Sequence, residues 1–117
     1  MSNNVIYELS KQFAIRIVKL YVFLKEEKQE FVISKQLYRC GTSIGANIAE
    51  STYAQSPADY ISKLSIALKE ASETLYWLDL LKETDNITTE QYNSISNDIK
   101  TIIGTLVNII KKLKHKQ

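Results

Sequence analysis

Four long segments of this chain repeat apolar residues every three or four positions, and very little interrupts them. The 117 residues include only three Gly and one Pro, too few for the many tight turns of an all-β domain. Apolar side chains at this spacing fall on one face of a helix. The sequence therefore predicts one all-α domain over residues 1–117, folded as an antiparallel four-helix bundle in up-down-up-down order.

The predicted helices cover about residues 4–25, 29–53, 57–83 and 88–114. Two of them have clear start signals. Ser56 stands where an N-cap is expected, followed by Pro57 and an acidic Asp59. Thr88 and Gln91 have the spacing of a capping box. The intervening segments are short, and short connections join antiparallel neighbours in a bundle.

The first and fourth segments carry more apolar residues than one core seam requires. In each, a second set widens the apolar face or lies opposite it, and a helix buried on one side needs no such set. We expect these residues to contact a partner chain. They are Ile15, Val18 and Val22 in the first segment and Ile103, Val107 and Ile110 in the fourth.

Small residues recur every fourth position in the second segment, at Gly41, Gly45 and Ala49. A glycine inside a helix costs about 1 kcal/mol relative to alanine. Small residues in such a row remove side-chain bulk and let a neighbouring helix approach closely. We therefore expect close packing of another helix along this row.

A row of polar residues runs beside the apolar stripe of the same segment. Ser and Asn are poor helix formers, so their presence here needs a reason. One interpretation is a half-buried hydrogen-bond network, in which Arg39 and Glu50 find partners on other helices; the other is direct contact with a ligand. The row, named here the polar ladder, comprises Gln36, Arg39, Ser43, Asn47 and Glu50.

The stretch from Gln36 to Glu50 resembles the signature of a bacterial four-helix-bundle family, the one named for a protein encoded in 23S rRNA intervening sequences. The family pattern is roughly Gln-x-x-Arg, then Ser-Ile-x-x-Asn-Ile-Ala-Glu-Gly. The resemblance continues through Asp59-Tyr60 and the third apolar segment, and it departs at Ser51, where the family usually has Gly. Accessory proteins of diversity-generating retroelements belong to the same family.

The resemblance implies a homo-oligomer, specifically a ring-like pentamer. It also implies an accessory role in binding RNA or DNA, with a protein partner such as a reverse transcriptase. For most members of the family it implies only an unknown role. The name of the family does not establish ribosome binding.

Charge is distributed unevenly along the chain. Fifteen Lys and Arg face thirteen Asp and Glu, and four of the lysines fall within the last seven residues. This basic tail either keeps the helix end soluble and complements its dipole, or contacts nucleic acid or another anionic surface. The candidate phosphate contacts are Lys11, Arg16, Lys19, Lys35, Arg39, Lys111, Lys112, Lys114 and Lys116.

Seven Tyr and Trp77 offer rings that stack on single-stranded bases or, alternatively, pack at helix seams. No RNA-recognition or helix-turn-helix motif is visible. Any binding of nucleic acid is therefore expected to depend on phosphate contacts and shape and not on base sequence. Assembly of several subunits would multiply a modest basic patch.

The residues of common catalytic and metal sites are largely missing. His115 is the single histidine, and Cys40 is the single cysteine and lies on the apolar stripe. A zinc site, a di-iron bundle and a Ser-His-Asp triad all need more of these side chains. Glu70 and Glu73 are expected on a solvated face. The sequence therefore predicts no catalytic residue, no metal and no cofactor.

The segment from Met1 to Asn4 lacks the features of a signal peptide. No uncharged apolar run approaches the roughly 20 residues that a membrane span needs. A lone cysteine suits a reducing compartment. The sequence thus predicts a cytoplasmic protein without membrane contact.

Two functions remain open from the sequence. The first is a non-catalytic, oligomeric accessory protein that binds RNA or DNA through basic surfaces. The second is a protein-interaction or scaffold module without a nucleic-acid role.

Overall fold

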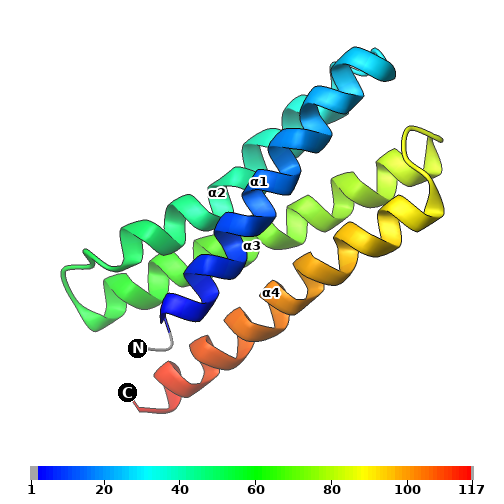
Figure 1. The fold of residues 1–117 in the computed structure, drawn as a ribbon. Helices are drawn as coiled ribbons and strands as arrows, with labels where there is room; N and C mark the ends of the chain where they lie inside the picture. The colour runs from blue at the N-terminus through cyan, green and yellow to red at the C-terminus, as the bar shows by residue number, and fades with distance from the viewer. Residues whose placement is uncertain (1–2, 117) are drawn as a thin grey trace.

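A computed structural model describes residues 3–116, with side chains from Val5 onward. Its helices are α1 (Asn3–Glu27), α2 (Ile33–Ser51), α3 (Pro57–Glu83) and α4 (Thr89–His115). Each helix runs opposite to the one before it, in a bundle of about 47 × 21 × 19 Å (Figure 1). Because α1 contacts α2 and α4, and α3 contacts the same two helices, the four helices surround one core. The predicted all-α four-helix bundle is confirmed.

Both predicted helix starts are confirmed. The Ser56 hydroxyl accepts the backbone N–H of Asp59 at 3.1 Å, and Pro57 opens α3. At α4 the Thr88 hydroxyl accepts the Gln91 N–H at 3.0 Å, while the Gln91 side chain accepts the Thr88 N–H at 2.8 Å. These bonds satisfy backbone donors that a helix start leaves free.

The second helix is shorter than the predicted 29–53, since α2 begins at Ile33 and ends at Ser51. Gln29 has a left-handed backbone with φ of 51°, which cannot continue a helix. The Glu30 carboxylate then accepts the backbone N–H groups of Val32, Ile33 and Ser34 at 3.2, 2.9 and 2.6 Å. A carboxylate at this position satisfies the free donors and complements the helix dipole. This capping by a glutamate side chain sets the start of α2.

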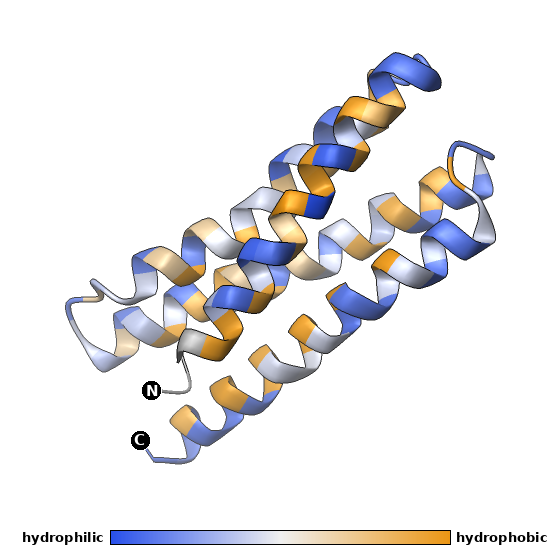
Figure 2. Ribbon diagram, in the orientation of Figure 1, coloured by the Kyte–Doolittle hydropathy of each residue, from blue (hydrophilic) through white to orange (hydrophobic). Residues whose placement is uncertain are grey.

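Isoleucine and leucine from all four helices form the core, and the apolar positions turn inward along each ribbon (Figure 2). Leu9 has the apolar spacing of Ile6 and Phe13 on α1, which predicts burial, but it is 36 % exposed whereas those two are buried. On α3 the apolar spacing predicts Leu68 and Leu75 at the centre of the core, but the buried face is rotated away from them. Ala67 and Thr74 are fully buried, whereas Leu68 and Leu75 are half-buried beside them.

The glycine row of α2 packs against α1. A Cβ atom added to Gly41 would lie 2.9 Å from Cγ1 of Ile17, and one added to Gly45 would lie 3.3 Å from the Ser10 hydroxyl oxygen. Gly41 is itself buried. The predicted close approach of another helix is therefore confirmed, and that helix is α1.

The two surplus apolar sets differ in their exposure to solvent. On α1, Ile15, Val18 and Val22 remain 41, 41 and 43 % exposed. On α4 the set is covered more fully, since Ile110 is buried and the other two residues are half-buried, and its contact with a partner chain stays a prediction. Since α4 contacts both α3 and α1, it needs a wide apolar face within the bundle itself.

None of the helices formed by residues 3–116 is both long enough and apolar enough to cross a membrane.

Alanine substitutions at two glycines should have opposite effects on stability. At Gly41 the added methyl collides with the buried Ile17, and such overpacking costs about 1–3 kcal/mol, more than the roughly 1 kcal/mol gained in helix propensity. At Gly104 an added Cβ meets no atom within 4 Å, so Gly104→Ala should stabilise by about 0.5–1 kcal/mol. Urea unfolding at one fixed protein concentration measures both, and equal signs would contradict the close packing at Gly41.

Candidate nucleic-acid interface

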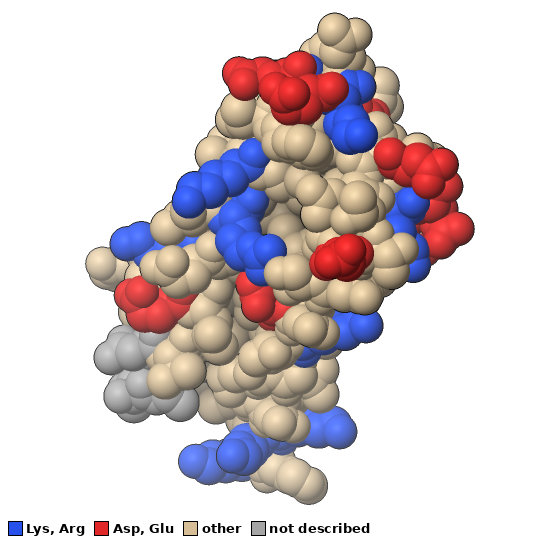
Figure 3. Space-filling model, turned by 45° about the vertical axis from the view of Figure 1, so that its right-hand side comes forward, with Lys and Arg blue, Asp and Glu red and all other residues tan. Residues whose placement is uncertain are grey.

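The most open basic group is the end of α4. Lys111, Lys112, Lys114 and Lys116 are exposed on or just beyond its last turns. Within residues 3–116 none of the four forms an ion pair. Figure 3 shows Lys and Arg side chains gathered at the lower tip of the molecule, away from the acidic groups near the other end. These four lysines are named here the basic tail.

A second group lies on α1, where its members differ in their contacts. Arg16 bridges α1 and α4, because one guanidinium nitrogen lies 2.6 Å from a carboxylate oxygen of Asp98 and the other donates to the Ser94 hydroxyl at 3.0 Å. Lys11 and Lys19 are exposed, and among the described residues they have no carboxylate partner. Arg16 is thus an interhelical link, and its charge is partly neutralised.

A groove of about 460 Å³ opens beside Arg16, between α1 and the start of α4. Its apolar lining comes from both helices and from the connection before α4, while its polar lining carries both signs of charge. It does not single out an anionic ligand. The lining residues are Arg16, Lys19, Leu20, Phe23, Ile87, Glu90, Gln91, Ser94 and Ile95.

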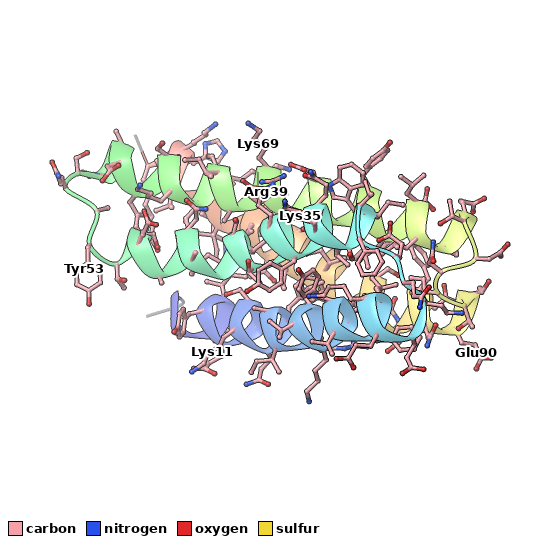
Figure 4. The ribbon with its side chains drawn as sticks, turned by 90° about the horizontal axis from the view of Figure 1, so that it is seen from above. Lys11, Lys35, Arg39, Tyr53, Lys69 and Glu90 are labelled. Atoms are coloured by element: carbon pink, nitrogen blue, oxygen red, sulfur yellow. The ribbon has the colours of Figure 1, made fainter. Side chains whose placement is uncertain are left out.

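The third basic group lies along α2 and α3. In Figure 4 the side chains of Lys35 and Arg39 lie over α2 and α3 and Lys69 projects from the α3 edge of the bundle, whereas Lys11 points from the opposite edge. Sequence reasoning missed Lys69, which lies in α3, far along the chain from the polar ladder. The predicted basic residues therefore form three separate groups, and the structure does not bring them into one patch on a single chain.

Arg39 is held by carboxylates of α3. Its guanidinium lies 3.5 Å from a carboxylate oxygen of Glu70 and 2.5 Å from one of Glu73. The Trp77 indole N–H also donates to Glu73, at 3.0 Å. The expectation that Glu70 and Glu73 face solvent is wrong, since their side chains are only 18 and 33 % exposed. The core-facing side of α3 includes Ala67 and Thr74. This orientation turns Glu70 and Glu73 toward α2 and away from solvent.

Three more members of the polar ladder bond within the bundle, while Gln36 is half-buried. The Ser43 hydroxyl donates to the Arg39 carbonyl at 2.6 Å, and the Asn47 side chain donates to the Ser43 carbonyl at 2.9 Å. Glu50 pairs with Lys63 of α3 at 3.0 Å, and this hydrogen bond raises the pKa of the Lys63 ammonium. Arg39 and Glu50 thus both have partners on another helix, and contact with a ligand stays a prediction.

Cys40 lies beside this network but is closed to solvent. Its side chain is fully buried, and the Thr74 hydroxyl donates to its sulfur at 3.2 Å. Burial raises the pKa of the Cys40 thiol. A protonated, inaccessible thiol is a poor nucleophile. Among residues 3–116 no group of three or more His, Cys, Asp or Glu is arranged to hold a metal ion.

Several aromatic rings have partners within the chain. Tyr21 and Tyr38 pack across α1 and α2 with ring centroids 4.6 Å apart, and Lys25 lies over the Tyr21 ring. Tyr76 contacts Trp77 edge to face. Tyr76 and Tyr53 are 59 and 87 % exposed, so these two rings are the most accessible for stacking.

The fold, together with the signature on α2, agrees with comparison against known proteins. The family model described as 23S rRNA-intervening sequence protein matches residues 2–108. The chain belongs to the 23S rRNA-intervening sequence protein family. The resemblance seen in the sequence from Gln36 to Glu50 is thereby confirmed.

A solved structure similar to this family member is that of a protein with unknown function from the S23 ribosomal protein family of Bacteroides thetaiotaomicron. The two are 59 % identical, with 95 % of this chain and 99 % of the other covered, and their TM-score is 0.93. Comparison with curated proteins gave no match.

Replacing Arg39 should separate the structural role of the polar ladder from ligand contact. In Arg39→Ala the carboxylates of Glu70 and Glu73 lose their shared cation. The side chain of Arg39 is half exposed, so we expect a loss of about 1 kcal/mol of stability. Chemical denaturation measures this loss. A variant with unchanged stability but lost nucleic-acid affinity would instead indicate that Arg39 contacts the ligand.

Proposed function

We propose that this protein is a non-catalytic accessory protein that assembles into a homo-oligomer and binds RNA or DNA through its basic tail. The observation that carries the proposal is the set of four exposed lysines at the end of α4, without an ion pair among the described residues. Such side chains release counterions when they contact phosphates, and this release drives nonspecific binding. The proposed setting is the cytoplasm, which suits a lone reduced cysteine.

The contacts of the other basic residues rank them below the tail. Arg16 and Arg39 each form ion pairs with carboxylates, so their attraction for phosphate is reduced. Lys11, Lys19, Lys35 and Lys69 are exposed but scattered over different helices. In an oligomer, each tail would be repeated once per subunit, and several weak contacts would act together on one polyanion.

Charge reversal in the tail tests this proposal. We expect Lys111→Glu/Lys112→Glu to weaken binding of a structured RNA and of duplex DNA at least tenfold at low salt. Two lost phosphate contacts should also lower the slope of log affinity against log salt by about 2. Fluorescence anisotropy across a salt series measures both quantities.

A matched control is Lys25→Glu/Lys28→Glu, which changes the net charge equally but lies at the opposite end of the bundle. Equal losses in the two variants would show that net charge alone governs binding. Unchanged binding in the tail variant would rule out the tail as the interface.

The alternative function is a protein-interaction or scaffold module. The exposed α1 strip of Ile15, Val18 and Val22 favours it, because a contiguous apolar strip on a soluble surface marks an interaction site. The oligomer proposed above uses the same strip. A specific protein that co-purifies after nuclease treatment, together with no binding of RNA or DNA at low salt, would favour the scaffold function.

Acidic residues in the strip test its role in assembly. Val18→Glu/Val22→Glu should lower the mass of the particle to that of the monomer, because four charges would be buried in each pair of contacting strips. Light scattering after size-exclusion chromatography measures the mass. Ile66→Glu/Tyr76→Glu is the matched control, since these α3 residues are similarly exposed, at 38 and 59 %. If both variants keep the wild-type mass, assembly uses another surface.

A further inference from the structure

Opposite charges collect at the two ends of the bundle. One end carries the α1–α2 and α3–α4 connections, and its segments 26–32 and 79–90 hold seven acidic and two basic residues. Glu26, Glu27, Asp85 and Glu90 are exposed there, and among the described residues they form no ion pair. The other end carries the basic tail. In Figure 3 acidic groups lie over the upper and middle parts of the molecule, interspersed with basic ones, whereas its lower tip carries basic groups.

The acidic end also presents two apolar side chains that the core does not use. Phe31 and Val32 are 60 and 75 % exposed in the connection between α1 and α2. Their backbone is fixed on both sides: the Glu30 N–H donates to the Leu24 carbonyl at 2.9 Å, and the Glu30 carboxylate holds the first N–H groups of α2. A surface that is already ordered loses little conformational entropy on binding. Phe31 and Val32 therefore form a preformed apolar surface, surrounded by the carboxylates of segments 26–32 and 79–90. These two segments together are named here the acidic tip.

We propose that the acidic tip docks the basic tail of a second copy of this chain, end to end. The tail brings four lysines to the exposed carboxylates, and Leu113, which packs against the core of its own bundle but is only partly buried, leaves an apolar surface among them for Phe31 and Val32. Lys25 and Lys28 also lie near this end and form no ion pair among the described residues, but they offset only part of this attraction. Complementary charges steer such an encounter and fix its orientation. A nucleic acid is a poor occupant of this tip, because the same carboxylates repel phosphate.

The contact joins unlike surfaces that lie at opposite ends of the molecule. In such a heterologous contact every assembly of copies keeps one free tip at one end and one free tail at the other, so it grows with concentration and does not stop at a fixed number. This separates it from the closed oligomer proposed through α1. Since the tail is also the proposed phosphate contact, an added polyanion should compete with the tip and shorten the chains of copies.

Light scattering over a range of protein concentrations tests the contact first. In about 20 mM salt, where charges are screened weakly, we expect the mean mass to rise with concentration, and in 0.5 M salt to stay constant. Phe31→Ser should reduce the rise at low salt at least threefold, whereas Tyr76→Ser, which removes a similarly exposed ring from α3, should leave it unchanged. A mass independent of concentration at low salt, or equal effects of the two substitutions, would overturn the proposal.

Two charge-reversed variants give the second test. Glu26→Lys/Glu27→Lys/Glu90→Lys turns the net charge of segments 26–32 and 79–90 from −5 to +1, so that both ends are basic, and Lys111→Glu/Lys112→Glu/Lys114→Glu makes both ends acidic. Neither variant alone should grow with concentration, but an equal mixture should, because the reversed tip then meets the reversed tail. Growth of either variant alone, or none in the mixture, would contradict end-to-end docking. Nucleic-acid binding by the tip variant should persist, so failure of this contact and failure of the proposed function are told apart.

Discussion

The fold depends on how closely α1 approaches α2. At Gly41 there is no room for even a methyl group beside Ile17, and at Gly45 the Ser10 hydroxyl takes the corresponding space. This proximity keeps Ile17 and the neighbouring core residues of α1 fully buried. It also leaves another side of α1 in solvent, where Ile15, Val18 and Val22 remain exposed. The helix-propensity cost of two glycines is offset by the contacts that their absent side chains permit.

Much of the fold could be predicted from the sequence because its signals are local. The apolar spacing, the Ser56 cap and the Thr88–Gln91 capping box each act within one or two helical turns, and all appear in the structure. The start of α2 was missed because a glutamate is an unusual cap, and only its three backbone bonds reveal its role. The rotation of α3 was missed because Ala67 and Thr74 are weak markers of a core. That rotation places Glu70 and Glu73 beside Arg39, so the ion-pair partners of Arg39 could not be predicted from the sequence either.

The candidate interface shows the same division between local and long-range information. The basic tail is visible in the sequence as a cluster, and its exposure follows from its place at a helix end. The pairing of Arg16 with Asp98 joins residues 82 positions apart, and no local pattern predicts it. Consequently a count of basic residues overestimates the positive charge that a polyanion can contact. Arg16 and Arg39 are partly neutralised by ion pairs, which leaves the lysines as the stronger candidates. Membership of the 23S rRNA-intervening sequence protein family fixes the architecture, while these side-chain contacts distinguish the surfaces on it.

The Arg16–Asp98 bridge also bears on the order in which the chain folds. The contacts of α1 with α2, of α2 with α3 and of α3 with α4 join consecutive helices, and such short loops close quickly. Only the seam between α1 and α4 requires almost the whole chain. During synthesis the first three helices can therefore dock before α4 has been made, leaving a trough lined by core leucines and isoleucines. Arrival of α4 buries that trough and closes the bundle, so a nascent chain that stalls before residue 89 would present its core to chaperones and to other unfinished chains.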